Sequence, residues 1–146
     1  MVWRRDGFEI TTDRARIDVN AVHRFLSEDS YWAKSIPREV VERSVRHSLC
    51  FAILHADELA GFARVISDRA TFAYLGDVFV LPAHRGKGLS KWLMECISHH
   101  PELQGLRRWM LATSDAHGLY AQFGFTPIRT PPRWMEKHDP DVYKKS

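Results

Sequence analysis

Apolar residues recur along this chain with two different periods, which predicts a chain that contains both strands and helices. Helical spacing begins after Asp18, again near Pro37 and again at Gly86, where apolar positions repeat every three or four residues. Five further runs are apolar or alternating, as strands are: 8–12, 49–54, 59–66, 71–81 and 107–112. The pattern therefore predicts an α/β (α+β) chain.

The connections between the runs predict how the strands pair. Short polar segments separate 49–54, 59–66 and 71–81, which favours an antiparallel meander. A helix separates 71–81 from 107–112, so these two strands are free to lie parallel.

The last part of the chain is expected to hold one short helix and two more strands. Ser114 or Asp115 suits the start of the helix, and Gly124 suits its end. The segments 125–129 and 134–138, split by prolines, are expected to pair as closing strands.

The stretch 78–97 carries the strongest functional signal. Its apolar strand ends at Pro82, passes through a basic glycine turn and continues into a helix. The helix has one apolar stripe: Leu89, Trp92, Leu93, Cys96 and Ile97. The pattern is typical of a strand, an anion-binding turn and a helix.

The turn has the chemistry of a phosphate site, because a helix start offers unpaired N–H groups and the positive end of its dipole. Gly86 and Gly88 leave these amides accessible, Arg85 offers paired N–H donors, and Lys87 and Lys91 add charge. The alternative is a solvated surface turn. Spacing excludes a P-loop, and a dinucleotide fingerprint would require glycine in place of Lys91.

The hexapeptide Arg85-Gly86-Lys87-Gly88-Leu89-Ser90 resembles the acetyl-CoA signature of the GNAT N-acetyltransferase superfamily, R/Q-x-x-G-x-G/A. Ser90 departs from the pattern, but serine is also small. Tyr120-Ala-Gln-Phe-Gly124-Phe125 resembles the second signature of that family and follows at the expected separation. Each motif alone is weak, whereas the two in order are fairly specific.

The resemblance covers roughly residues 8–138 and implies a single GNAT domain over 1–146. It implies a mixed, mostly antiparallel sheet of about six or seven strands with about four helices, and a splayed strand pair forming the acetyl-CoA cleft. The implied cofactor contacts come from Val78, Phe79, Val80, Arg85, Gly86, Lys87, Gly88, Leu89, Ser90, Lys91, Ser114, His117 and Tyr120.

The implied activity is transfer of acetyl from acetyl-CoA to a primary amine of a small molecule or peptide, by direct attack in a ternary complex. The alternative is a catalytically weak CoA-binding module with a regulatory or ligand-sensing role. In the first case, backbone amides at Phe79 and Val80 are candidate donors to the thioester carbonyl. Tyr120 is the candidate hydrogen-bond donor to the leaving thiolate, helped if a helix start lowers its pKa; otherwise it is a core tyrosine.

Deprotonation of the amine is less well determined. Asp77 is the best-placed carboxylate, although a structural ion pair with Arg64 fits it equally well. Asp68, Glu58 and Asp115 are weaker candidates for the base. His117 is compatible with a proton relay, a CoA contact or a surface position, and we favour the last.

The resemblance implies that the loop between the first two helices lies over the acceptor site. Tyr31 and Trp32 interrupt the helical pattern there, and they either line the pocket or close the core. With Arg64 and Asp68 they suggest a partly aromatic pocket with charge of both signs, which suits many amines.

Composition excludes several other classes. The 146 residues are 45% hydrophobic and 12% aromatic, enough for a globular core, and the formal charge of +3 is too small and scattered to predict nucleic-acid binding. Cys50 and Cys96 are expected to be buried, reduced thiols. We expect no metal, no membrane segment and a cytoplasmic location; a homodimer is compatible with the resemblance.

Overall fold

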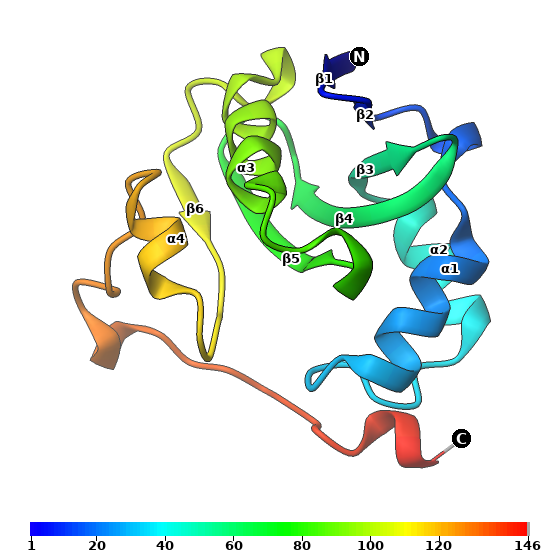
Figure 1. Cartoon of the computed structure of the whole chain (residues 1–146). Coiled ribbons are helices and arrows are strands. Elements are labelled where there is room, and N and C mark those ends of the chain that lie inside the picture. The colour runs from blue at the N-terminus through cyan, green and yellow to red at the C-terminus, as the bar shows by residue number, and fades with distance from the viewer. Residues whose placement is uncertain (146) are drawn as a thin grey trace.

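The computed structural model describes residues 1–145, in which one six-stranded sheet has helices on both faces (Figure 1). The strands are β1 (Val2–Arg5), β2 (Phe8–Thr11), β3 (Leu49–His55), β4 (Glu58–Ser67), β5 (Phe72–Val80) and β6 (Arg108–Met110). They lie side by side in chain order, and every neighbouring pair is antiparallel except β5 and β6. The predicted meander and the predicted parallel pair are both confirmed.

Four α-helices flank the sheet: α1 (Val19–Arg24), α2 (Arg38–Arg46), α3 (Leu89–His99) and α4 (His117–Ala121). The shorter helical turns are η1 (Arg14–Arg16), η2 (Phe25–Asp29), η3 (Pro82–His84), η4 (Pro101–Leu103), η5 (Pro131–Arg133) and η6 (Val142–Lys145). The predicted α/β fold is thus confirmed. The π-helical turn η2 continues directly from α1 into the loop with Tyr31 and Trp32. We name residues 25–36 the acceptor loop, after the role predicted for it from the sequence.

Two apolar cores hold the layers together. On one face of the sheet, Val41 and Val45 of α2 are buried with Phe62 of β4. On the other face, the stripe of α3, with Leu93 and Ile97, packs over β3 and β5. Each such side chain contributes about 1.5–3 kcal/mol when fully buried. Strand β5 contributes Phe79 to the first core and Leu75 to the second, so it is fixed from both faces of the sheet.

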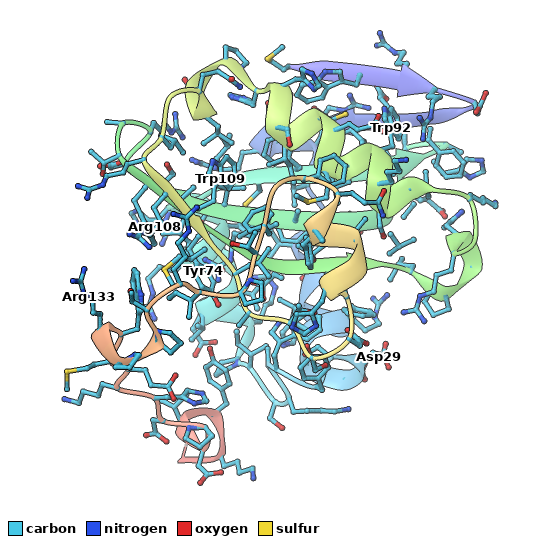
Figure 2. The ribbon with its side chains drawn as sticks, turned by 90° about the vertical axis from the view of Figure 1, so that its left-hand side faces the viewer. Asp29, Tyr74, Trp92, Arg108, Trp109 and Arg133 are labelled. Carbon is cyan, nitrogen blue, oxygen red and sulfur yellow. The ribbon has the colours of Figure 1, made fainter. Side chains whose placement is uncertain are left out.

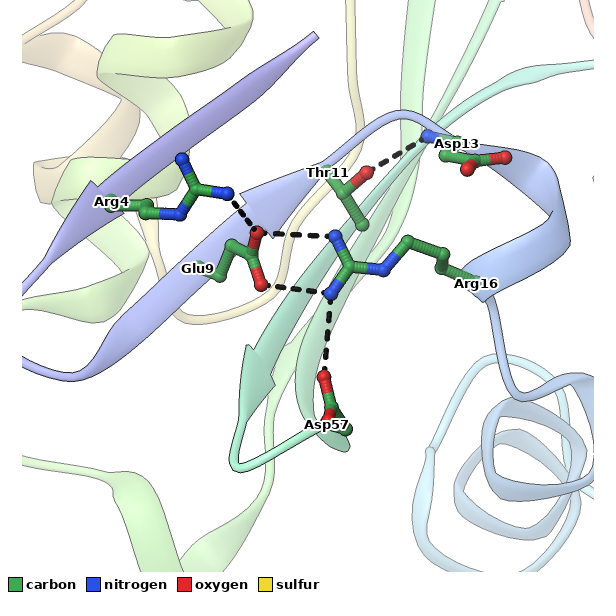
Figure 3. Close-up of polar contacts among 6 residues, drawn as sticks. All are labelled: Arg4, Glu9, Thr11, Asp13, Arg16 and Asp57. Atoms are coloured by element: carbon green, nitrogen blue, oxygen red, sulfur yellow. Dashed lines mark hydrogen bonds and ion pairs between the residues drawn. The ribbon is translucent and has the colours of Figure 1, made fainter.

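A cluster of charged side chains stabilises the edge of the sheet near β1 (Figure 3). Glu9 accepts two hydrogen bonds from Arg16, at 2.8 and 3.1 Å, and pairs with Arg4 at 3.2 Å. Asp57, in the β3–β4 turn, approaches Arg16 at 3.5 Å. Hydrogen bonding from Arg16 lowers the pKa of the Glu9 carboxyl. The N-terminal strands are therefore joined to the β3–β4 hairpin.

Two predictions about the ends of the chain are wrong. Strand β1 was not expected, because VWRR has no alternation. It pairs with β2 and is held further by the ion pair of Arg4 with Glu9 and by packing of Trp3 against Phe51. The expected closing strands 125–129 and 134–138 are absent from the described chain. Pro127, Pro131 and Pro132 have no backbone N–H to donate to a neighbouring strand. Met135 is 96% exposed, so burial does not favour strand pairing there either.

The C-terminal segment instead crosses the lower side of the molecule, from the α4 end toward α1 and the acceptor loop (Figure 1). It is tied to the sheet where the guanidinium of Arg108 on β6 lies 4.6 Å from the ring centre of Trp134. Figure 2 shows Arg108 beside this segment. We call residues 134–143 the C-terminal segment below.

Both cysteines, Cys50 and Cys96, are free and buried, as predicted. Burial raises the pKa of the Cys50 thiol to about 12 and that of Cys96 to about 11. Neither thiol therefore has the thiolate character of a nucleophile. Among the described residues, no helix is long and apolar enough to span a membrane.

Candidate active site

A cleft of about 1190 Å³ opens along β5, the start of α3, the loop after β6 and α4 on one side. The acceptor loop and the C-terminal segment close its other side. Typical small-molecule sites measure about 300–1,000 Å³, so this cleft has room for two substrates. We call the part next to α3 and α4 the cofactor half and the remainder the acceptor half, after the ligands predicted for them from the sequence.

The start of α3 leaves its backbone amides open to the cofactor half. Gly86 and Gly88 have φ angles of +80° and +73°, which glycine adopts without strain, and a Cβ at either position would meet no atom within 4 Å. Gly88 is the N-cap residue, and no side chain caps the helix. Unpaired N–H groups, the helix dipole and open space together suit an anionic group.

The basic residues of this turn differ in position. Arg85 donates its Nε–H to the carbonyl oxygen of Val80 at 2.9 Å, which leaves its terminal N–H groups for a ligand. Lys87 lies with its Nζ 5.4 Å from the ring centre of Phe8. Neither Lys87 nor Lys91 lines the cleft, whereas Gly86, Gly88, Leu89 and Ser90 do.

His84 also lines the cleft, and its Nδ1 is buried without a hydrogen-bond partner among the described residues. Burial first, and the charges of Lys87 and His55 next, lower its pKa. The imidazole is therefore favoured in its neutral form next to the proposed phosphate site.

The edge of β5 faces the cleft because β6 is short. The two strands pair only from Phe72 to Tyr74, opposite Arg108 to Met110. On the other edge, Leu81 donates to Ala60 at 2.8 Å, and Phe79 lies in register with Phe62. By the alternation of an antiparallel ladder, the Phe79 amide faces β4, whereas the Val80 amide faces the cleft. Val78, next to the bulge at Asp77, also lines the cleft.

Tyr120 lies on α4 and lines the cofactor half. The residue is 7% exposed, its ring packs edge-on to Phe125 at 6.0 Å, and Gly124 ends the helix with φ +89°. Burial first, and then Tyr31 and Asp115, raise the pKa of the phenol to about 12. The start of α4 therefore does not lower the pKa of this phenol, because burial outweighs the dipole of a five-residue helix.

The loop that leads into α4 is held by Thr113, a residue that the sequence reasoning missed. Its Oγ1 accepts from the amides of Ala116 at 3.1 Å and Asp115 at 3.4 Å, so the expected capping by Ser114 or Asp115 is wrong. The Ser114 amide donates to the Tyr31 hydroxyl at 3.1 Å. His117 is exposed and does not line the cleft.

The acceptor half contains the two predicted aromatic residues. Tyr31 is 60% exposed and Trp32 is 40% exposed, so they line the cleft and are not core residues. The Trp32 Nε1–H donates to one Asp77 oxygen at 2.8 Å, and the Arg64 Nε–H donates to the other at 2.8 Å. The ion pair of Arg64 and Asp77 is therefore present, and a base role for Asp77 stays a hypothesis.

Asp68 lies in the β4–β5 turn, and the structure does not bring it to the cleft. Its carboxylate accepts from the Thr71 hydroxyl and from the amides of Ala70, Thr71 and Phe72. These hydrogen bonds, that of the Thr71 hydroxyl foremost, lower the pKa of the carboxyl. The geometry is that of a turn-stabilising aspartate.

Other residues of the acceptor half were not predicted, because no local motif marks them. Asp29 comes from η2 and Tyr74 from β5; Figure 2 labels both. The C-terminal segment adds Glu136, Lys137, His138 and Tyr143. Tyr74 could have been predicted weakly, because it occupies one of the alternate, exposed positions of β5. No sequence feature predicted the path of the C-terminal segment.

Comparisons with known proteins agree with this fold. The model of the acetyltransferase (GNAT) family matches residues 19–125. A candidate acetyltransferase of Gibberella zeae is 32% identical over 82% of this chain and 79% of its own length. The crystal structure of a GNAT-family candidate acetyltransferase from Xanthomonas campestris pv. campestris is 54% identical, with a TM-score of 0.93, over 96% of this chain and 99% of that chain.

A candidate acetyltransferase of Clostridium acetobutylicum, solved with acetyl-CoA, shares the fold at 14% identity and a TM-score of 0.61, over 90% of this chain and 94% of that chain. The fold and the family match together define an acetyltransferase. This chain belongs to the acetyltransferase (GNAT) family, whose members use acetyl-CoA and an acceptor substrate.

Proposed function

We propose that this protein transfers the acetyl group of acetyl-CoA to a primary amine of a small molecule or peptide, by direct attack in a ternary complex. The observation that carries the proposal is the two-sided cleft. One side has the uncapped start of α3 and the Tyr120 ring, and the other has exposed aromatic rings. Because both halves open into one space, two substrates are able to meet there.

The cofactor half fits coenzyme A. The amides at Gly86 to Ser90 and the terminal N–H groups of Arg85 would hold the pyrophosphate, and the outward amide of Val80 would pair with the peptide-like pantetheine arm. Lys87 and Lys91 lie outside the cleft lining and suit a more distant phosphate. Acetyl-CoA would supply the acetyl group as an activated thioester.

The cleft also has donors for the charge that develops during transfer. As the neutral amine forms its bond to the acetyl carbon, the carbonyl oxygen gains charge, and the Val78 amide is the candidate donor to it. The carbon–sulfur bond then breaks, the sulfur leaves as a thiolate, and the nitrogen of the new amide releases one proton to solvent. A phenol of pKa about 12 would give its proton to a thiol of pKa about 8.5 only at a cost of about 5 kcal/mol, so Tyr120 acts by hydrogen bonding.

The acceptor half favours amines with an apolar or aromatic body and an additional positive charge. Tyr31, Trp32 and Tyr74 present partly exposed rings to bind such a body and to attract a cation. Asp29 and Glu136 line the same half and have no ion-pair partner among the described residues. The attacking amine must be neutral, so these carboxylates suit a second cationic group of the acceptor.

A coupled assay tests the proposal. Purified protein is incubated with acetyl-CoA and a panel of amines, with free thiol and acetylated amine measured together. Equal amounts of both products are expected, with arylalkylamines and diamines ahead of acidic amino acids. Binding of acetyl-CoA without acetylated product from any amine would indicate the ligand-sensing alternative. The control is Arg46→Ala, since Arg46 is an exposed arginine that does not line the cleft.

A further inference from the structure

We infer that Asp77 is a positioning residue, which fixes Trp32 and thereby the acceptor loop, and that it is not the base that takes the proton from the amine. The inference rests on the proposed acetyl transfer for its kinetic consequences. The contacts that carry it do not depend on that reaction.

Both carboxylate oxygens of Asp77 are directed at protein donors. Oδ1 accepts from Trp32 and Oδ2 accepts from Arg64, each at 2.8 Å, and Arg64 in turn donates to the Ser48 hydroxyl at 3.2 Å. The side chains of Asp77 and Arg64 are only 11% and 19% exposed. A base needs an oxygen aimed at the amine, whereas these oxygens are aimed at the indole and the guanidinium.

The backbone at Asp77 indicates that its side chain is needed there. Asp77 has φ +53°, in the left-handed region that favours glycine, within a bulge of β5 where the register to β4 shifts between Phe62 and Arg64. An aspartate in such a conformation persists where its surroundings hold it. Here the surroundings are its two hydrogen-bonded partners.

Trp32, held by Asp77, in turn packs against other aromatic residues of the acceptor half. Its ring packs edge-on to Tyr31 at 5.0 Å and tilted against Phe25 at 6.4 Å. The Tyr31 hydroxyl accepts from the Ser114 amide across the cleft. The acceptor loop is thus joined to β5 through Trp32 and to the loop after β6 through Tyr31. Asp77 is the side chain on β5 that holds Trp32 and thereby connects the acceptor loop to β5.

Steady-state kinetics with the best amine of the panel separate the two roles. For Asp77→Asn we expect the acceptor KM to rise about 10-fold, with kcat within about threefold and an unchanged pH profile of kcat. A base would instead give a loss in kcat of about 100-fold or more and the disappearance of one limb of the pH profile. That result would overturn the inference.

A double variant tests whether the effect passes through Trp32. Trp32→Phe removes the indole N–H and should reproduce the KM rise of Asp77→Asn, and the two changes together should raise KM no further. Additive effects would contradict the inference. The matched control is Asp57→Asn, because Asp57 is also an arginine-paired aspartate with positive φ (+66°) but lies outside the cleft lining. Unchanged affinity for acetyl-CoA verifies that each variant is folded.

A measurement without turnover keeps the inference separate from the proposed function. In ¹H–¹⁵N spectra, the indole signal of Trp32, assigned by its loss in Trp32→Phe, should move in Asp77→Asn, and that of Trp109 should not. An unmoved Trp32 signal rejects the inference alone. A wild-type protein that acetylates no amine rejects the proposed function alone.

Discussion

The two halves of the cleft are built in different ways. The cofactor half comes largely from one continuous stretch, from the end of β5 through the glycine turn to α3, and it presents backbone amides. The acceptor half is assembled from η2, β4, β5 and the C-terminal segment, and it presents side chains. Backbone amides recognise a constant group such as a pyrophosphate, whereas side chains set the choice of partner.

The starts of two helices make the same contrast. The carboxylate of Asp18 caps α1 by accepting from the Ala21 amide at 3.0 Å, so that end is satisfied within the protein. Gly88 begins α3 with no capping side chain. Of these two helices, the one whose start lines the cleft is the one without a capping side chain.

The largest expected effect comes from closing that open end. Gly88→Asp places a carboxylate where we propose the pyrophosphate, so acetyl-CoA affinity should fall about 100-fold through like-charge repulsion. Gly88→Asn is the matched control, because it has the same backbone strain without the charge and should lose about 10-fold or less. Isothermal titration measures both. Equal affinity in the two variants would contradict a phosphate site here.

The next effect concerns the side chain closest to the chemistry. Tyr120→Phe should lower kcat about 30-fold with acetyl-CoA affinity unchanged, since we propose that the lost hydroxyl donates a hydrogen bond to the departing thiolate. Because the pKa of Tyr120 is raised to about 12, wild-type activity should show no alkaline limb from this phenol below about pH 10. A variant with full turnover would remove Tyr120 from the mechanism.

A third change acts on the acceptor half alone. Ending the chain after Arg133 removes the C-terminal segment, which should raise the acceptor KM about 10-fold and leave acetyl-CoA affinity unchanged. Within that segment, Glu136→Gln should raise KM about threefold for a diamine and little for a singly charged amine. Loss of acetyl-CoA binding on truncation would show that the two halves are not separable.

The smallest expected effect is a pH-dependent loss of stability when Asp68 is replaced. Asp68 lies outside both halves of the cleft. Hydrogen bonds in the folded chain hold its pKa below the unfolded value of about 3.9, so the stabilisation is present above that pH and is lost as the pH falls through the lowered folded pKa. Asp68→Ala should lower Tm by about 2 °C at pH 7 and by less near pH 2, measured by calorimetry. A constant difference across pH would contradict this role.

The contrast between the halves also explains how far the sequence alone could go. The glycine turn, the meander and Tyr120 were predictable because local spacing or a short motif determines each of them. The neighbours of Asp77 were partly predictable, as its pairing with Arg64 follows from adjacent strands. Its bond to Trp32, 45 residues away, was not predictable.

Errors arose where tertiary contacts override local pattern. The segment after Phe125 has apolar residues at strand-like spacing, but its prolines and its contact with Arg108 lead it across the cleft instead. Asp68 satisfies its own turn, which spacing could not distinguish from a pocket residue. The pKa of Tyr120 depends on burial by residues far along the chain, so no motif could give its direction.

The most direct test of the central claim is a crystal structure of this protein with coenzyme A. The account predicts the pyrophosphate within hydrogen-bond distance of the amides at Gly86 to Ser90, and the sulfur next to the Tyr120 hydroxyl. Coenzyme A bound elsewhere, or a sulfur far from that hydroxyl, would contradict it.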